Sequence, residues 1–361
     1  MMRSVAVVAA VALVLPAAAA ADSSRFAPVE VPATDLADAT GAVAMSAAAG
    51  HVVFSRAAGK DVYQLVEWSA AGGLRVLPAG TRTAPFDADA GLDARGRPVV
   101  TFSTCPAGVR VITVARRRCT LRVLRLDRSD ARPRTLRLHG DRGLSLTRPS
   151  VRGRAVVAVA APTGRSRNVR ILYWATAAKT PQRLSGGRAS CPSYEHCTSA
   201  PATAVNGLDL GRRSVAFVWD VNPGGEGVGA TQELRTTPLN GGRSRQAVRA
   251  HGYISGACGY RRPGSPNALD TGGVGFVLTQ SPCDADETTI ARWGPGAADF
   301  EGARPAGTLV GGAAWDGPRI YWLRCAPRHD PVYDADVLSD ACRLAFTRAM
   351  PFGPPTLAAH G

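Results

Sequence analysis

The sequence predicts an all-β fold built from repeated four-stranded sheets, and three observations support this prediction. Glycine and proline are frequent, with 39 Gly and 26 Pro among 361 residues, so the elements should be short and joined by many turns. The segments between the turns alternate apolar and polar residues, as half-buried strands do. One short phrase, a glycine turn followed by a β-branched or aromatic run, recurs along the whole chain.

The repeated phrase indicates the number of units and the kind of fold. Its six copies lie roughly 45 to 61 residues apart and begin at Gly50, Gly96, Gly153, Gly211, Gly272 and Gly317. Around each copy the pattern predicts a small-residue strand before it, then a third strand and a polar fourth strand after it. Such four-stranded antiparallel units without helices between them predict a six-bladed β-propeller. A pair of β-sandwiches would not predict six copies of one phrase. A parallel β-helix would have much shorter repeats.

The alternation within each unit predicts where the strands lie. First strands are predicted at Ala42–Ala48, Phe86–Leu92, Val205–Leu210 and Leu309–Trp315. Third strands are predicted at Tyr63–Ser69, Thr120–Leu126, Val169–Thr176, Gln232–Pro238, Thr289–Trp293 and Arg343–Arg348. Fourth strands are predicted at Leu74–Pro78, Arg134–His139 and Ser244–Ala250, and Ala326–Ala341 is expected to be a long loop. The ring can close in two ways, because the last strand comes either from Thr356–Ala359 or from Pro28–Pro32.

Several fragments carry a family resemblance. Pro238–Arg245 reads Pro-Leu-Asn-Gly-Gly-Arg-Ser-Arg and follows a glycine-basic-x-apolar-Ala-Phe strand, and Gln64–Leu77 and Leu92–Arg97 are similar fragments. This pattern resembles the blade repeats of TolB-like propellers and extends over nearly all of the mature chain. The resemblance implies the propeller fold and does not imply a particular function.

The N-terminus is typical of a secretory signal. Arg3 provides a positive charge, Val5–Leu15 is apolar, and Ala17–Ala21 offers small-residue cleavage sites. We therefore expect a signal peptide over residues 1–21 and one propeller domain over residues 22–361, secreted or held in the periplasm or cell wall. No later stretch is long and apolar enough for a membrane span.

The eight cysteines are expected to form disulfides, because the chain is predicted to be exported. Pairing neighbours in order gives Cys105–Cys119, Cys191–Cys197, Cys258–Cys283 and Cys325–Cys342. A zinc site is the alternative, but the sequence contains no C-x-x-C spacing. On a propeller, all four pairs would lie on the face formed by second-to-third-strand loops and by connections between blades. We call this the stapled face.

The formal net charge of +15 is concentrated between Arg110 and Arg142, a segment with 11 Arg and 3 Asp. One interpretation is a partner-binding loop on the stapled face, formed by Arg110, Arg116, Arg117 and Arg118. The other is protection of an exposed strand edge by Arg122, Arg125, Arg134 and Arg137. For an exported chain a protein or an anionic envelope polymer is a better partner than nucleic acid, and we expect a monomer.

Signals for a metal or for catalysis are weak. Alternating carboxylates at Asp284 and Asp286, and at Asp334 and Asp336, are candidate calcium ligands, but a complete calcium loop is missing and no cofactor is expected. A calcium-dependent hydrolase of the lactonase or esterase type would draw on His196, His329, Asp330 and Asp87 at the channel mouth. The sequence favours a binding or scaffold protein over this alternative.

Overall fold

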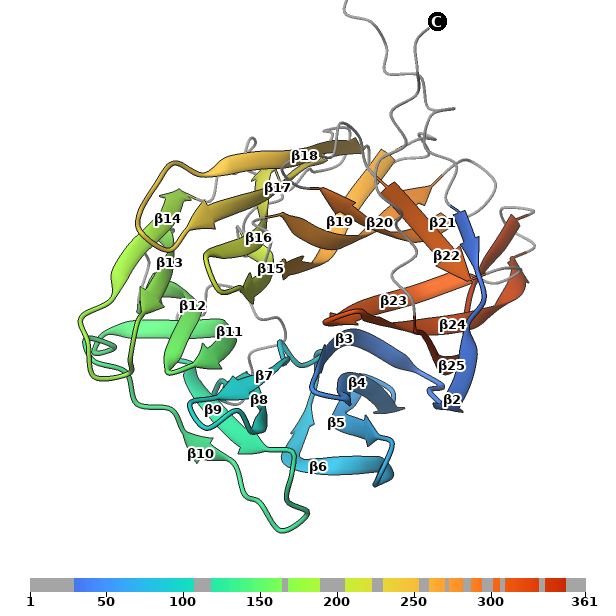
Figure 1. Ribbon diagram of the computed structural model, residues 1–361, viewed down its shortest axis with the longest axis horizontal. Coiled ribbons are helices and arrows are strands. Elements are labelled where there is room, and N and C mark those ends of the chain that lie inside the picture. Colours follow the sequence, from blue (N-terminus) through green and yellow to red (C-terminus); the bar gives the residue numbers. More distant parts are fainter. Residues whose placement is uncertain are drawn as a thin grey trace, which may run out of the picture.

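The computed structural model describes residues 29–106, 118–163, 168–188, 205–222, 230–252, 260–269, 273–281, 287–293, 301–305, 309–330 and 335–348. In these residues all the regular structure is β-strand. They include no helix that is long and apolar enough to cross a membrane. The sheets are arranged around a common axis, as in a propeller (Figure 1).

The first half of the ring contains twelve of the strands. One sheet consists of β3 (Ala42–Ala48), β4 (His51–Gly59), β5 (Val62–Ser69) and β6 (Gly73–Arg82). The next unit is β7 (Asp89–Asp93), β8 (Pro98–Thr104), β9 (Thr120–Arg125) and β10 (Arg134–Thr135). It is followed by β11 (Leu144–Gly153), β12 (Ala155–Pro162), β13 (Asn168–Trp174) and β14 (Gln182–Arg188).

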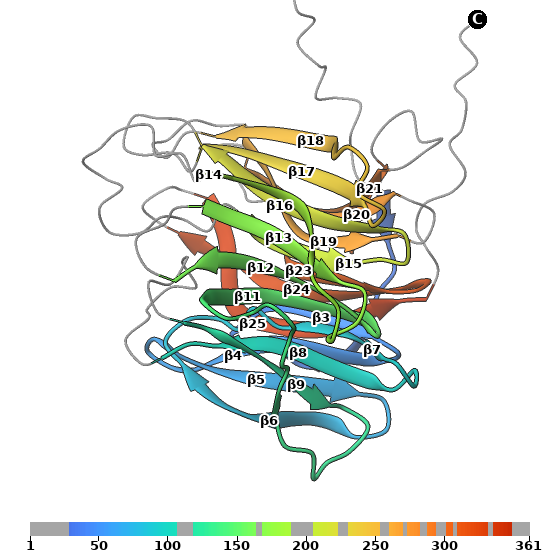
Figure 2. The ribbon, with the colours of Figure 1, turned by 90° about the vertical axis from the view of Figure 1, so that its left-hand side faces the viewer.

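The second half repeats this plan. One sheet consists of β15 (Val205–Leu210), β16 (Ser214–Asn222), β17 (Ala230–Pro238) and β18 (Arg245–Gly252). The next contains β19 (Tyr260–Ala268), β20 (Val274–Ser281), β21 (Glu287–Trp293) and β22 (Glu301–Pro305), joined by β1 (Val29–Val31). The last contains β23 (Leu309–Asp316), β24 (Arg319–Asp330) and β25 (Ala335–Thr347), with β2 (Thr34–Asp38) at its edge. In the side view β6 and β18 lie at opposite ends of the molecule (Figure 2).

The prediction of separate four-stranded sheets is confirmed only in part, because hydrogen bonding joins the strands into five sheets of four, four, four, five and eight strands. In the eight-stranded sheet, β7 pairs in parallel with β11 through Leu92 and Arg152 and through Asp93 and Gly153. Gly91 permits this approach, because a Cβ atom there would lie 2.1 Å from the carbonyl oxygen of Val151. The innermost strands of two neighbouring units therefore meet backbone to backbone.

The N-terminal segment closes the ring. β2 pairs antiparallel with β25, and β1 pairs in parallel with β22, so the start of the chain bridges the last two sheets. The Thr347 hydroxyl donates to the Pro32 carbonyl at 3.1 Å and fixes this crossing. The edge strand is thus Thr34–Asp38 rather than Pro28–Pro32; Thr356–Ala359 lies outside the described residues.

The core lies between neighbouring sheets and is formed chiefly by the second strands. Val52, Val53 and Phe54 of β4 are fully buried, and β12 is buried over most of its length. The predicted first strands Ala42–Ala48 and Val205–Leu210 agree with β3 and β15. The loop predicted at Ala326–Ala341 is wrong, because pairing from Pro327↔Leu338 to Asp330↔Ala335 extends β24 and β25 through most of it.

Candidate functional site

The first strands surround a central channel, which is where a propeller brings loops and side chains of several units together. Two cavities lie along it, with volumes of about 410 Å³ and about 120 Å³. Ala47, Asn267 and Trp315 line both cavities. Trp315 is only 2% exposed, and its ring packs against Gly275 at a position where a Cβ atom would lie 2.9 Å away. The Trp315 ring therefore packs between the sheets of β20 and β23 and borders both cavities.

Asp87 lies at the smaller cavity, and its carboxylate is used to hold the backbone. Oδ1 accepts hydrogen bonds from the Arg82 guanidinium and the Ser103 amide, both at 3.1 Å, and Oδ2 accepts from the Arg148 amide at 2.7 Å. Arg148 has a left-handed backbone conformation, with φ of 47°, at the bulge of β11. Burial alone would raise the pKa of Asp87, but Arg82 and these hydrogen bonds outweigh it and lower the pKa.

A belt of side chains connects the first strands around the channel. Ser46 Oγ donates to Asp89 Oδ1 at 2.7 Å and accepts from the Ala90 amide at 3.0 Å, which links β3 to β7. Ser150 Oγ accepts from the Leu210 amide at 3.0 Å, which links β11 to β15. Asp209 Oδ2 accepts from the Ala268 amide at 2.5 Å, which links β15 to β19. Each side chain satisfies a backbone amide that the next sheet would otherwise leave without a partner.

Asp89 and Asp209 form an electrostatically coupled pair in this belt. Burial, and then the charge of Asp209, raises the pKa of Asp89 to about 8. Burial also raises the pKa of Asp209, to about 6, although the Ala268 amide and Arg152 act in the opposite direction. Near neutral pH the pair therefore holds roughly one proton. Oδ2 of Asp89 is buried and makes no hydrogen bond within the described residues.

These channel residues show where the sequence interpretation was incomplete. Asp87 was a candidate, whereas Asp209, Ser46 and Ser150 were missed, although each of the first strands β3, β7, β11 and β15 contains a Ser or Asp that takes part in the belt. The candidate His329 is exposed on β24 and lines neither channel cavity. The side chain of Asp330 lies outside the described residues, and so does His196.

The stapled face is described in part. Cys105 and Cys119 form a disulfide across the β8–β9 connection, and Cys325 and Cys342 form one between β24 and β25, as predicted. Arg118 is exposed and lies 3.6 Å from Asp141. The other predicted residues of this face lie outside the described residues or have undescribed side chains: Cys191, Cys197, Cys258, Cys283, Arg110, Arg116, Arg117, Asp284, Asp286, Asp334 and Asp336.

No group of three or more His, Cys, Asp or Glu side chains within the described ranges is placed to hold a metal ion. The chemistry visible in the channel is that of paired carboxylates and hydroxyls bound to backbone amides. These hydrogen bonds connect neighbouring sheets around the channel.

Comparison with known proteins yields similarity of structure only. No protein-family model matches the chain, and no curated protein matches it. Among solved structures, TolB from Acinetobacter baumannii matches with a TM-score of 0.42 and 10% identity, over 79% of this chain and 59% of TolB. The calcium-binding protein regucalcin from Agrobacterium tumefaciens matches with a TM-score of 0.45 and 12% identity, over 89% and 95%.

A third solved structure is the β-propeller domain of the Trilobed protease from Pyrococcus furiosus, with a TM-score of 0.42 and 10% identity over 89% of this chain and 99% of that domain. The chain thus spans less than two thirds of TolB and nearly the whole of the other two. The assignment of a propeller-like arrangement rests on the strand pairing of the chain itself.

Proposed function

We propose that the chain is an exported six-bladed propeller that acts as a binding or scaffold protein, with its partner on the stapled face. The eight-stranded sheet supports this blade count, because its two antiparallel halves are joined by only two residue pairs. The signal-like residues 1–21 support export, and the two disulfides agree with an oxidising compartment.

One observation carries the choice of a binding protein. Four channel groups with acid, base or hydroxyl chemistry, Asp87, Asp209, Ser46 and Ser150, hydrogen-bond to the backbone of neighbouring strands, and Asp89 accepts a hydrogen bond from Ser46. A general acid or base must be within reach of a substrate atom, whereas these groups are occupied by bonds that hold the ring. The surface loops are then the part of the molecule left for function, as is common where a rigid scaffold presents them.

The experiment compares two variants of the full mature chain. In the first, Arg110, Arg116, Arg117 and Arg118 on the stapled face are changed to Glu. In the control, four exposed arginines in or next to the opposite loops are changed to Glu: Arg183, Arg213, Arg243 and Arg245. Each immobilised chain is incubated with purified anionic wall polymers and with envelope proteins, and bound material is quantified.

The proposal predicts that the stapled-face variant loses at least about tenfold in retained partner while the control variant retains it, since both carry the same change of charge. Equal recovery by the two variants would place the partner elsewhere. Turnover of a lactone or ester by the purified chain, abolished by Asp87→Asn, would instead support the hydrolase alternative.

A further inference from the structure

A groove lined with arginine lies at the end of the β7–β10 and β11–β14 units that is opposite the stapled face. In an antiparallel sheet, successive connections alternate between the two ends. The Cys105–Cys119 disulfide closes the β8–β9 connection, whereas the groove is lined by the β7–β8, β9–β10 and β11–β12 connections. Its volume is about 720 Å³. The groove therefore lies away from the stapled face, and Val151 is the one described lining residue that it shares with the channel cavities.

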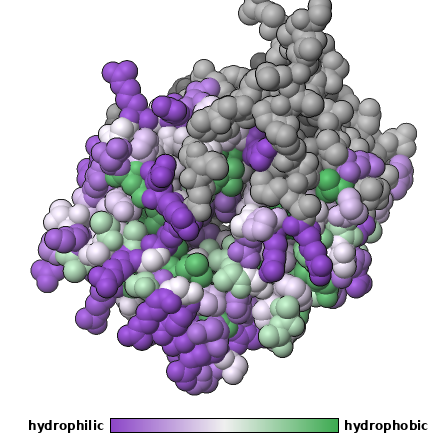
Figure 3. Space-filling model, in the orientation of Figure 1, coloured by the Kyte–Doolittle hydropathy of each residue, from purple (hydrophilic) through white to green (hydrophobic). Residues whose placement is uncertain are grey.

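The floor and the rim of the groove differ in character. Val99, Val123, Leu136, Val151 and Val156 contribute apolar surface, and Val99 and Val156 are almost fully buried. The lining also includes seven arginines and two aspartates. Figure 3 shows hydrophilic residues concentrated at the lower left of the molecule, where Figure 1 places β9 and β10. Cationic groups thus stand above a floor of low polarity.

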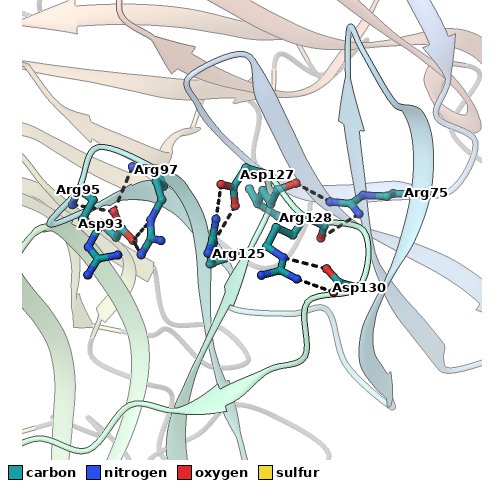
Figure 4. A network of polar contacts seen from close by, with 9 residues as sticks. Arg75, Asp93, Arg95, Arg97, Arg125, Asp127, Arg128 and Asp130 are labelled. Atoms are coloured by element: carbon teal, nitrogen blue, oxygen red, sulfur yellow. Dashed lines mark hydrogen bonds and ion pairs between the residues drawn. The ribbon is translucent and has the colours of Figure 1, made fainter.

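Three of these arginines are held by carboxylates from the same loops (Figure 4). Arg97 Nε and Nη2 donate to Asp93 Oδ2 at 2.8 and 2.6 Å. Arg125 donates to both oxygens of Asp127, at 2.9 and 2.5 Å. Arg128 does the same with Asp130, at 2.9 and 2.6 Å, and this pairing lowers the pKa of Asp130. These two-bond contacts fix the direction of each guanidinium.

A neighbouring sheet anchors the β9–β10 connection. Arg75 of β6 donates to the carbonyls of Leu126 and Arg128, at 2.6 and 3.3 Å, and lies beside them in Figure 4. Glu67, which is 1% exposed, holds Arg75 through a contact of 2.5 Å. The wall of the groove that carries Arg128 is therefore positioned before any ligand arrives, which lowers the entropy cost of binding.

The other four arginines of the lining have no such partner. Arg95, Arg132, Arg134 and Arg154 are exposed, and within the described part of the chain their side chains make no ion pair or hydrogen bond. Arg95, Arg132 and Arg154 come from three different connections and Arg134 begins β10, and the fold brings all four to one groove. Protection of a strand edge explains Arg134 on β10, but Arg95 and Arg154 lie at tight turns rather than on edge strands.

We propose that this groove binds a polyanion, a ligand with several phosphate or carboxylate groups in a row. Guanidinium groups present a planar fork of donors that matches such oxyanions. The apolar floor excludes water beneath the ligand and focuses the field of the arginines. The volume far exceeds that of one phosphate group, and the four open guanidiniums surround it, so one ligand can engage several of them at once.

The test measures binding of inorganic polyphosphate, with orthophosphate as the single-anion probe and polyglutamate as the carboxylate probe. The groove variant carries Arg95→Glu, Arg132→Glu, Arg134→Glu and Arg154→Glu. The variant with Arg183, Arg213, Arg243 and Arg245 changed to Glu is the matched control, because it has the same net charge and lies outside the groove. Thermal unfolding of both variants confirms that the ring remains folded.

The expected result is an about 30-fold loss of polyphosphate affinity in the groove variant and a much smaller loss in the control. Affinity should exceed that for orthophosphate and fall with added salt. Polyglutamate binding with the same variant pattern would identify carboxylate chains as ligands, and its absence would restrict the ligand to phosphate. Equal losses in the two variants, or polyphosphate binding no tighter than orthophosphate binding, would overturn the proposal. The outcome does not depend on partner recovery at the stapled face.

Discussion

Asp89 and Asp93 stand at opposite ends of β7, and their surroundings give them opposite properties. Asp89 faces the channel beside Asp209, and burial and that second carboxylate raise its pKa to about 8. Burial would also raise the pKa of Asp93, but hydrogen bonds from the Arg97 side chain and from the Arg97 and Arg95 amides bring it to about 2. At neutral pH one short strand therefore carries a carboxyl group that keeps its proton and another that is charged.

The difference between these two carboxyl groups reflects a difference in charge between the channel and the groove. In the channel, carboxylates outnumber the cations that contact them and bond mainly to backbone amides, so they connect the sheets. At the groove, arginines outnumber carboxylates, so each aspartate fixes one arginine and four remain open. A carboxylate can accept hydrogen bonds from the amides of a neighbouring sheet without any excess of charge nearby. Recognition of an anion, by contrast, needs an excess of cations.

The largest expected effect is the loss of unfolding free energy in Asp87→Ala. This change removes the carboxylate that, among the described residues, pairs with the largely buried Arg82, and it also leaves the Arg148 and Ser103 amides without their acceptor. Breaking a buried pair on one side costs about 3 kcal/mol of unfolding free energy. Urea denaturation measures the loss. Asp130→Ala, which breaks an exposed pair, is the control and should leave the midpoint unchanged. Similar losses in both variants would contradict the distinction between channel and groove.

A smaller, pH-dependent effect is expected for Asp89→Asn. Folded Asp89 keeps its proton up to about pH 8, whereas an aspartate in the unfolded chain releases it near pH 4. The folded state binds more protons between these values, so the unfolding free energy of the natural chain falls as the pH rises through this window. Asparagine does not ionise, and the variant should therefore be more stable at pH 8.5 by on the order of 2 kcal/mol.

The measurement is urea denaturation of both chains at pH 5, 7 and 8.5, and of Asp93→Asn also near pH 2.5. Asp93→Asn serves as the opposite case: because the pKa of Asp93 is lowered, its contribution is present above about pH 4 and is lost as the pH falls toward 2. If Asp89→Asn followed the same pH dependence as the natural chain, the channel carboxylates would not be the source of the loss.

The strands were predictable because their signals are local. Alternation and glycine turns fix β3 and β15 residue for residue, and the spacing of Cys105 and Cys119 predicted a bridge that the structure contains. The joining of β7 to β11 was not predictable, since it depends on the contact of Gly91 with Val151 of the next unit. Periodicity gives the faces of a strand but not the neighbours that its ends meet.

The carboxylate pair in the channel and the arginine-lined groove were not predictable for the same reason. Asp89 and Asp209 are far apart in sequence, and only the ring brings them together. The basic segment was interpreted either as a loop on the stapled face or as protection of a strand edge, and neither interpretation included a groove. The fold sends Arg118 to the stapled face and Arg128 to the groove, where Arg154 of the next unit joins it. Successive connections of an antiparallel sheet lie at alternate ends. A count of charges along the sequence therefore does not show at which end of the sheet each charge lies.

The smallest expected effect is a change of polyphosphate affinity when a carboxylate, rather than an arginine, is removed from the groove. Asp93→Asn removes one negative charge from the lining and weakens the two contacts that hold Arg97, so polyphosphate affinity should rise about twofold to threefold at low salt. Asp89→Asn, at the channel end of the same strand, should leave this affinity unchanged. Isothermal titration at two salt concentrations measures both. Weaker binding by Asp93→Asn would mean that Arg97 must be held in place by Asp93 to contribute, and that fixed direction matters more in this groove than total charge.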